Sequence, residues 1–330
     1  MLMHPSHPLS RSTRSARPGF SVVELLVVIG IITLLVGLLL PALGKAQQKA
    51  RAAATLSTMQ SFAQACETYK QQIGAYPGVV PEAVLANDPK ISGTENAVLA
   101  LMGGAVTQDD PDFATFGTGW TTINFNAPGG GTFSIKVNAT QIGQGPRING
   151  KQYPPFYSPK SGEFAPAPGQ DLATAVDGTG FENDAYRLPD LLDAWGQPIM
   201  YVRAIRSSGP LVGPVTASPQ FAMGSMQPYI VSVALGELGK DQKTTSILET
   251  GNDPAGNFAQ IIRHPAFGAA NQPLAGTARG QFVLVSAGQD GVYFSRFDGP
   301  GTPVDPIDDI ASIGPKVAES YNDLVIMGGS

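Results

Sequence analysis

Residues Arg17–Pro41, RPGFSVVELLVVIGIITLLVGLLLP, carry the strongest structural signal in this chain of 330 residues. No charged residue lies between Glu24 and Lys45, so twenty uncharged residues follow one another. As a helix they would be about 30 Å long, which matches the thickness of the hydrocarbon core of a bilayer. The segment therefore predicts a helix that is inserted in a membrane.

The same segment differs from a secretory signal peptide and from a plain membrane anchor. A secretory signal has a shorter apolar core that ends at a small-residue cleavage site, whereas this run continues through Leu38–Leu40 into a polar, helix-forming stretch. A plain anchor does not explain Glu24, because an unpaired carboxylate in lipid costs about 2–3 kcal/mol. We therefore expect a partner for Glu24, such as the free α-amino group of a neighbouring subunit that is cut before Phe20.

The residues at this junction resemble a known family. The stretch Gly19–Leu26, GFSVVELL, is similar to the class III signal of type IV pilins and type II secretion pseudopilins. The resemblance implies that a prepilin peptidase cuts between Gly19 and Phe20 on the cytoplasmic side and methylates the new N-terminus. It also implies that Glu24 sets subunit register during assembly, and that Pro41 corresponds to the helix-kinking proline of the family.

Helical periodicity continues beyond the apolar segment. One helix face carries apolar residues at spacings of 3, 4, 3 and 4, namely Met59, Phe62, Cys66, Tyr69 and Ile73. Gly74 and Pro77 then predict the end of the helix. A nearly continuous helix from Phe20 to Ile73 would be about 80 Å long. Because proline lacks a backbone donor, we expect a kink or a locally melted turn at Pro41.

The middle of the chain, residues 76–187, is rich in glycine, proline, threonine and asparagine and predicts a loop-rich insertion. Within it, one short helix is expected between Asn87 and Leu101. Two β-prone runs, Thr121–Phe125 and Thr132–Val137, flank Pro128–Gly131 and predict a hairpin.

The C-terminal part contains a turn that also resembles the family. Asp193–Pro198, DAWGQP, is similar to the Asp-Pro-Trp-Gly-x-Pro turn of major pseudopilins, with Ala194 in place of the usual proline. Gly196 and Pro198 form the turn in this interpretation, and Trp195 is a structural anchor against the helix. Further strands are predicted at Ile199–Val202, Tyr229–Ala234, Gln281–Ser286 and Tyr321–Met327.

An aspartate-rich loop follows the strand that ends at Ser286. Asp290 precedes a glycine and is explained by a tight turn alone, but four more carboxylates follow among glycines and prolines: Asp298, Asp305, Asp308 and Asp309. Irregular loops of this composition suit Ca²⁺, which takes six to eight oxygen ligands. Similarity to the calcium loop of the major pseudopilin implies Asp290, Asp308 and Asp309 as ligands, with Asp298 as a further candidate.

Composition restricts the function classes. The net charge of −5 becomes −8 without Arg11, Arg14 and Arg17 of the leader, so we expect no nucleic acid partner. Cys66 is the single cysteine, which rules out an internal disulfide and a Cys-rich zinc site. His264 is the single histidine after the leader, and a Cys–His nucleophile pair is therefore not expected. The chain is predicted not to be an enzyme.

These observations predict an α+β, pilin-like protein whose long N-terminal helix packs on a C-terminal antiparallel sheet. The expected parts are a cytoplasmic leader (1–19), a transmembrane and assembly helix (20–44), an amphipathic stalk helix (45–75), the loop-rich insertion (76–187) and a sheet-containing head with the aspartate-rich loop (188–330).

The resemblance implies a single-pass inner-membrane protein with a periplasmic head, which assembles into the pseudopilus of a type II secretion system and drives export of folded proteins. Its partners would be the prepilin peptidase, other pseudopilin subunits and an inner-membrane assembly platform. The alternatives are a subunit of a type IV pilus or DNA-uptake pseudopilus, and an anchored enzyme or ligand-binding head.

Overall fold

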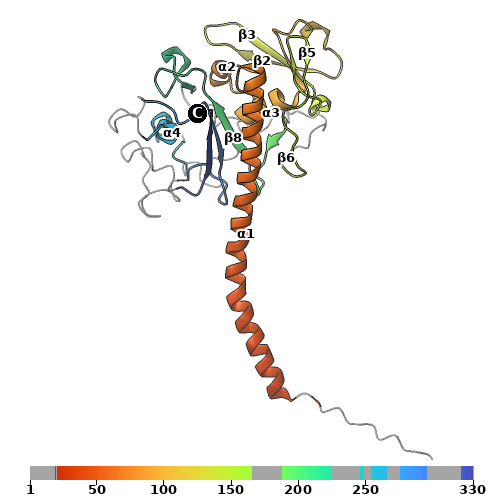
Figure 1. Cartoon of the computed structure of the whole chain (residues 1–330), viewed down its shortest axis with the longest axis vertical. Helices are drawn as coiled ribbons and strands as arrows, with labels where there is room; N and C mark the ends of the chain where they lie inside the picture. Colours follow the sequence, from red (N-terminus) through yellow and green to blue (C-terminus); the bar gives the residue numbers. More distant parts are fainter. Residues whose placement is uncertain are drawn as a thin grey trace, which may run out of the picture. The chain divides into compact units, whose positions relative to one another are not determined.

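The computed structural model describes residue 19 and residues 21–165, 188–223, 246–248, 254–265, 276–295 and 321–329. Two compact units divide the chain, Met1–Lys49 and Ala50–Ser330, and we call the second unit the head. The described residues contain helices and small, mostly antiparallel sheets (Figure 1). This combination agrees with the predicted α+β class.

The first element is the helix α1, Val22–Ile73, which contributes to both units. It ends as predicted, because Gly74 adopts φ = +92° and its N–H donates to the Lys70 carbonyl oxygen at 2.9 Å. Pro41 lies inside the helix, and the chain remains helical on both sides of it. Of the two expected alternatives, the melted turn is therefore absent, since the loss of one backbone donor does not interrupt the helix here. A kink at Pro41 stays a prediction.

The part of α1 that belongs to the head buries the predicted face. Met59, Phe62 and Cys66 are fully buried, and Tyr69 is nearly so. The Phe62 ring makes edge contacts with Tyr157 and Tyr201, at centroid distances of 5.2 and 6.1 Å. The prediction from periodicity is confirmed, and aromatic side chains from two distant segments of the head hold this face of the helix.

A second helix, α3 (Gly93–Met102), is buried along its whole length. A helix of this kind belongs to the interior of a domain. Its start is fixed by a capping box: the Glu95 N–H donates to Ser92 Oγ at 3.0 Å, and the Ser92 N–H donates to Glu95 Oε2 at 2.6 Å. The short helix α2, Glu82–Asn87, precedes it.

The predicted hairpin is present as β2 (Thr121–Asn126) and β3 (Thr132–Val137), and β1 (Ala105–Thr107) pairs with the other side of β3. The Ala127 N–H donates to the Gly131 carbonyl oxygen at 3.1 Å, which closes the turn. Residues 76–165 thus contain more regular structure than the predicted insertion, because two helices and this sheet lie within them.

The C-terminal sheet has the order β12–β11–β8 and is antiparallel throughout. Its strands are β8 (Ile199–Arg203), β11 (Phe282–Ser286) and β12 (Leu324–Gly328), close to the predicted positions. Tyr201 of β8 brings the sheet against Phe62 of α1. The strand predicted at Tyr229–Ala234 lies outside the described residues.

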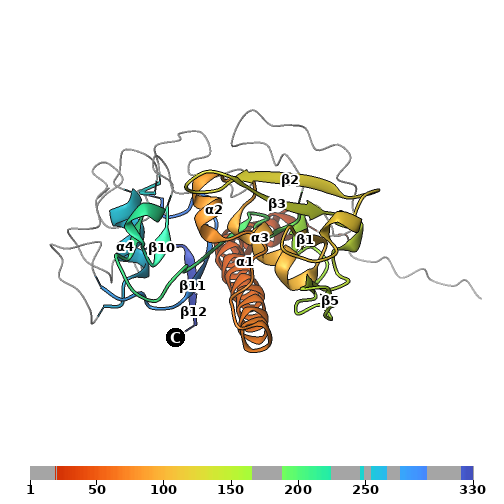
Figure 2. The same cartoon turned by 90° about the horizontal axis from the view of Figure 1, so that it is seen from above.

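The remaining elements are short. They are β4 (Arg147–Ile148), β5 (Lys151–Gln152), β6 (Phe164–Ala165), β7 (Asp190–Leu191), β9 (Val212–Gly213), β10 (Phe221–Ala222), α4 (Pro254–Ile262) and the 3₁₀ turns Phe113–Thr115, Ala139–Gln141 and Val215–Ala217. Among them β9 and β10 form a parallel pair. Within the head, α4 and the β1–β3–β2 sheet lie on different sides of α2 and α3 (Figure 2).

Candidate functional site

The N-terminal end of α1 contains the predicted processing and assembly residues. Gly19 is exposed two residues before Ser21, and Phe20 between them lies outside the described residues. Glu24 stands in the first helical turn, where the Ser21 N–H donates to its Oε2 at 2.8 Å. In return, the Glu24 N–H donates to Ser21 Oγ at 3.2 Å. Two backbone donors at the helix start are thereby satisfied within the chain.

This capping box is a feature that the sequence analysis missed. Ser21 and Glu24 have the Ser-x-x-Glu spacing that signals such a box directly before an apolar run. From the sequence we expected a partner for Glu24 only in another subunit. The structure shows a partner inside the same chain, and the carboxylate also complements the positive end of the helix dipole. Glu24 therefore has a local role that does not require a second subunit.

The helix that follows presents an apolar surface on all its sides. From Val22 to Leu43 the large apolar side chains are exposed by 43 to 76%. The helix is long and apolar enough to cross a membrane, with a mean hydropathy of 2.9 in a window of 18 residues of which none is buried. An apolar surface of this extent is not stable in water, so another apolar phase or molecule must cover it.

In the head, the predicted Asp193–Pro198 turn is organised by its first residue. Asp193 Oδ1 accepts hydrogen bonds from the N–H groups of Trp195 and Gln197, both at 2.9 Å. Its other oxygen, Oδ2, accepts one from the Ser286 hydroxyl at 2.7 Å. Gly196 adopts φ = +81°, which favours glycine at this point of the turn. Asp193 is 5% exposed, and burial raises the pKa of its carboxyl although the hydrogen bonds from Ser286 and the turn act in the opposite direction.

Trp195 is half-buried and does not belong to the buried core of the head. Its predicted role as an anchor against α1 stays a prediction. The turn does contact α1 through the N–H of Ala194, which donates to Thr55 Oγ1 at 3.0 Å. A small residue beside the helix allows this close backbone approach, so Asp193, Ala194 and Thr55 link the turn to α1.

The same turn is joined to the start of the aspartate-rich loop. Ser286, which bonds Asp193, is the last residue of β11. The Tyr293 hydroxyl donates to the Pro198 carbonyl oxygen. The structure thus brings the turn and the described part of the loop together, whereas the sequence analysis treated them separately.

The candidate metal ligands are only partly described. Asp290 is half-buried, and its Oδ1 accepts a hydrogen bond from the Val292 N–H at 3.2 Å, as expected for a turn residue. The other candidates lie outside the described residues: Asp298, Asp305, Asp308 and Asp309. Among the described residues, no group of three or more histidine, cysteine, aspartate or glutamate side chains is placed to hold a metal ion. Asp323, near the loop, has a structural role because its Oδ1 accepts from the Phe294 N–H at 2.9 Å.

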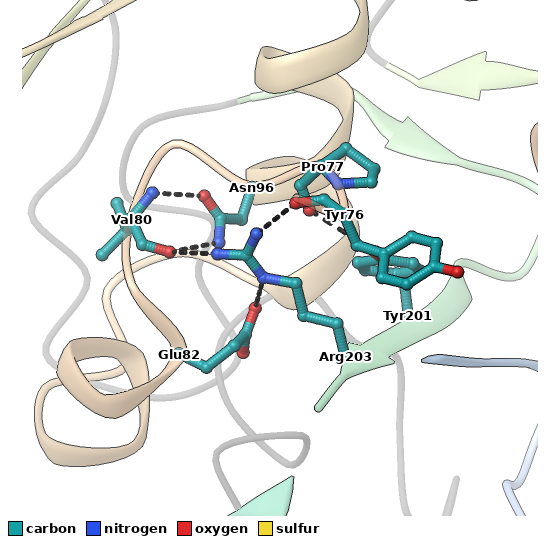
Figure 3. A network of polar contacts seen from close by, with 7 residues as sticks. All are labelled: Tyr76, Pro77, Val80, Glu82, Asn96, Tyr201 and Arg203. Atoms are coloured by element: carbon teal, nitrogen blue, oxygen red, sulfur yellow. Dashed lines mark hydrogen bonds and ion pairs between the residues drawn. The ribbon is translucent and has the colours of Figure 1, made fainter. Parts of the chain in front are cut away.

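A buried ion pair fixes the segment that leaves α1 (Figure 3). The Nε atom of Arg203, on β8, lies 2.7 Å from Oε1 of Glu82, on α2. The same guanidinium donates to the carbonyl oxygens of Tyr76 and Val80. Asn96 of α3 also bonds both backbone groups of Val80, at 2.8 and 2.9 Å. The network ties the chain after α1 to both the sheet and the central helix.

Cys66 has the properties of a packing residue. It is fully buried on the head face of α1, and burial, followed by the charge of Glu67, raises the pKa of its thiol well above the usual value. A thiol under these conditions rarely ionises and is a poor nucleophile.

Comparisons of this chain with protein families, with curated proteins and with solved structures found no match.

Proposed function

We propose that this chain is a structural subunit of a membrane-anchored filament, of the kind formed by type II secretion pseudopilins. One observation carries the proposal above all others. A helix with a fully exposed apolar surface begins directly after the Gly19–Phe20 junction, and it has Glu24 in its first turn. The resemblance of Gly19–Leu26 to the class III signal implies that the chain is cut at this junction and that Glu24 acts in assembly.

In this proposal the apolar part of α1 has two successive environments. Before assembly it lies in the inner membrane, with the leader in the cytoplasm, as the arginines of the leader favour. After cleavage by a prepilin peptidase it packs against the same segment of neighbouring subunits on an assembly platform. Both environments cover side chains that the chain itself leaves exposed. The filament then moves folded proteins outward, with energy from a separate ATPase.

Glu24 would contribute in both environments. Its carboxylate accepts the Ser21 N–H within the chain, so part of the cost of placing a charge in lipid is already offset. A cut between Gly19 and Phe20 leaves Ser21 in place and creates an α-amino group one residue before it. A carboxylate at this point can therefore keep its capping bond and attract the new amino group of a neighbouring subunit.

Calcium binding by the aspartate-rich loop is a secondary part of the proposal, supported by the loop composition and the resemblance. Asp290, Asp298, Asp308 and Asp309 would hold the ion, which would order the loop next to the Asp193 turn. Calcium should then raise the melting temperature of the detergent-solubilised chain, and Asp290→Ala should reduce the increase. The same melting temperature in excess chelator and in excess calcium would contradict calcium binding by the loop.

The processing step gives the direct test of the main proposal. The chain is co-expressed with a prepilin peptidase, and the mass of the purified product is measured. We expect loss of Met1–Gly19 and the addition of one methyl group at Phe20. Gly19→Val should abolish cleavage, while the matched variant Gly30→Val, inside α1, should be cut normally, because a side chain at Gly30 meets open space. An intact leader in the unmodified chain would contradict the proposal.

A second experiment separates secretion from the other filament classes. Deletion of the gene should remove specific proteins from the culture medium without the loss of surface filaments. Loss of long surface filaments with unchanged secretion would instead identify a type IV pilus subunit, and loss of DNA uptake alone would identify a DNA-uptake pseudopilus.

A further inference from the structure

The head contains an open pocket near one end of the β1–β3–β2 sheet. Its volume is about 80 Å³, which is smaller than the roughly 300–1,000 Å³ of typical small-molecule sites, and it is partly open to solvent. Strand β1 contributes Ala105 and Val106, and the rest of the described lining comes from the segments around the 3₁₀ turns Phe113–Thr115 and Ala139–Gln141 and from the β4–β5 hairpin. Its described lining contains neither Glu24 nor Asp290 of the predicted assembly and calcium sites.

Two aromatic rings line one side of this pocket. Phe116 and Trp120 are half-buried, with ring centroids 4.7 Å apart and planes inclined by 59°. Aromatic faces carry partial negative charge and attract the weakly positive C–H groups of a flat or puckered ring. The Trp120 indole N–H makes no hydrogen bond to any other described residue, so it is available to a ligand.

Glutamine side chains supply the polar part of the lining. The side-chain amides of Gln141 and Gln144 form no hydrogen bond with the rest of the described chain, so each can donate two bonds and accept two. Gln152 differs because its Nε2 donates to the carbonyl oxygens of Gln144 and Gly145, at 3.2 and 2.6 Å. Two amides are thus free to bind, and a third is held in place.

Among the described residues of the lining, Arg147 is the one that carries a charge, and this charge is already neutralised. Arg147 forms an ion pair with Asp112, and its Nε lies 3.7 Å from Oδ1 of the buried Asp110. Its guanidinium also lies 5.7 Å from the centroid of the Phe116 ring, which it helps to orient. With its charge compensated by two carboxylates, Arg147 does not make the pocket a site for anions.

We propose that this pocket binds one ring of a neutral carbohydrate. A pyranose ring has an apolar C–H face, which fits the aromatic side, and neighbouring hydroxyl groups, which fit amides that both donate and accept. At about 80 Å³ the pocket is too small to enclose a large ligand, but because it is partly open to solvent it can take one face or edge of a single ring, either of a single sugar or of one unit of a longer chain. The proposal concerns the head only and does not depend on the filament function.

Binding is tested with the full chain in a detergent that has no sugar headgroup. The probes are methyl pyranosides of glucose, galactose, mannose and N-acetylglucosamine, together with cellotetraose. Trp195→Phe leaves Trp120 as the single tryptophan of the chain, so its fluorescence reports directly on the pocket. We expect a saturable change with at least one neutral probe, and tighter binding of cellotetraose would identify a chain as the natural form.

Variants then assign the binding to the pocket by calorimetry. Trp120→Ala should weaken binding about tenfold or more, through the loss of the aromatic contact. Gln144→Ala should weaken it about fivefold, through the loss of hydrogen bonds from an exposed residue whose removal does not disturb the fold. The matched control is Gln72→Ala, an exposed glutamine on α1, which should bind as the unmodified chain does.

Three results would overturn the proposal. One is the absence of saturable binding to every probe, and another is equal binding by Trp120→Ala and the unmodified chain. The third is a preference for another ligand class, seen as tenfold tighter binding of glucuronate than of glucose, or as binding of a proline-rich peptide in place of the sugars.

Discussion

The two parts of helix α1 have the same secondary structure and opposite surroundings. The side chains from Val22 to Leu43 are apolar and exposed, whereas Met59, Phe62 and Cys66 on the later part are completely buried. The later part is covered by residues of the same chain, so its packing contributes to the stability of the head. The earlier part is not covered by the described residues, and its apolar surface needs an apolar environment such as lipid or another protein. One continuous helix thus combines a segment that folds with the chain and a segment that needs an external partner.

Two side-chain truncations in α1 test this difference, and the first should have the largest effect. Phe62→Ala should lower the free energy of unfolding of the head by about 3–5 kcal/mol, because it removes a fully buried ring that contacts Tyr157 and Tyr201. Chemical unfolding of the detergent-solubilised chain, followed by near-UV circular dichroism, measures this loss.

The matched variant is Leu35→Ala, at a side chain that is 52% exposed. It should change the unfolding of the head by less than about 0.5 kcal/mol, as expected for a residue without partners in the chain. Equal losses for Phe62→Ala and Leu35→Ala would show that the apolar part of α1 also packs on the head, and the comparison would then be wrong.

The next largest effect on stability is expected at the buried ion pair between Arg203 and Glu82. Glu82→Ala should destabilise the head by about 3 kcal/mol, because Arg203 keeps its charge in a site with little access to water. The double variant Glu82→Met, Arg203→Met should recover a large part of this loss, since no unpaired charge remains. Lys160→Met is the control. The Lys160 side chain is 73% exposed, and its Nζ atom lies 4.0 Å from Oε1 of Glu163, so the loss of this ion pair should have almost no effect on the free energy of unfolding.

The sequence predicted those parts of the fold that local patterns encode. Periodicity identified the buried face of α1, and alternating β-prone runs around Pro128–Gly131 identified the β2–β3 hairpin. The Arg203–Glu82 pair joins residues 121 positions apart. No local pattern indicates which distant charges meet, so this pair could not be predicted.

The candidate site shows the same limit. The Asp193 turn was predicted from its motif, but its bond to Ser286 joins residues 93 positions apart and required the structure. The anchor role of Trp195 stays a prediction, since its side chain is half-buried and lies outside the buried core of the head. The sequence shows that a bulky residue lies in a turn, but not how deeply the head buries it.

The third largest effect on stability is expected at Asp193. Asp193→Ala should destabilise the head by about 1–3 kcal/mol, because the N–H groups of Trp195 and Gln197 and the Ser286 hydroxyl lose their acceptor. Asp193→Asn keeps one oxygen for the two N–H groups and should lose less. Similar losses for both variants would show that the turn is held by its backbone alone.

The protonation of Asp193 should make the free energy of unfolding of the head depend on pH. Burial raises the pKa of this carboxyl in the folded head, so folding favours its protonated form. The corresponding stabilisation is complete below the ordinary carboxyl pKa of about 4 and is lost as the pH rises through the raised value. Asp193→Asn should remove this part of the pH dependence. An identical pH profile of unfolding for the unmodified chain and Asp193→Asn would contradict the assignment.

The smallest effect concerns Glu24, which shares its capping arrangement with the buried Glu95 of the head. Glu24→Gln keeps a side chain that can accept the Ser21 N–H but removes the charge, whereas Glu24→Ala removes both. If capping is its main role, Glu24→Gln should assemble into filaments like the unmodified chain, and Glu24→Ala should lose about 1 kcal/mol of helix stability at the first turn. If the charge attracts the amino group of a neighbouring subunit, both variants should be cleaved and methylated yet fail to assemble. Cross-linking of processed subunits distinguishes the two cases, and the filament proposal requires the second, because only a charge requirement connects Glu24 to a partner outside its own chain.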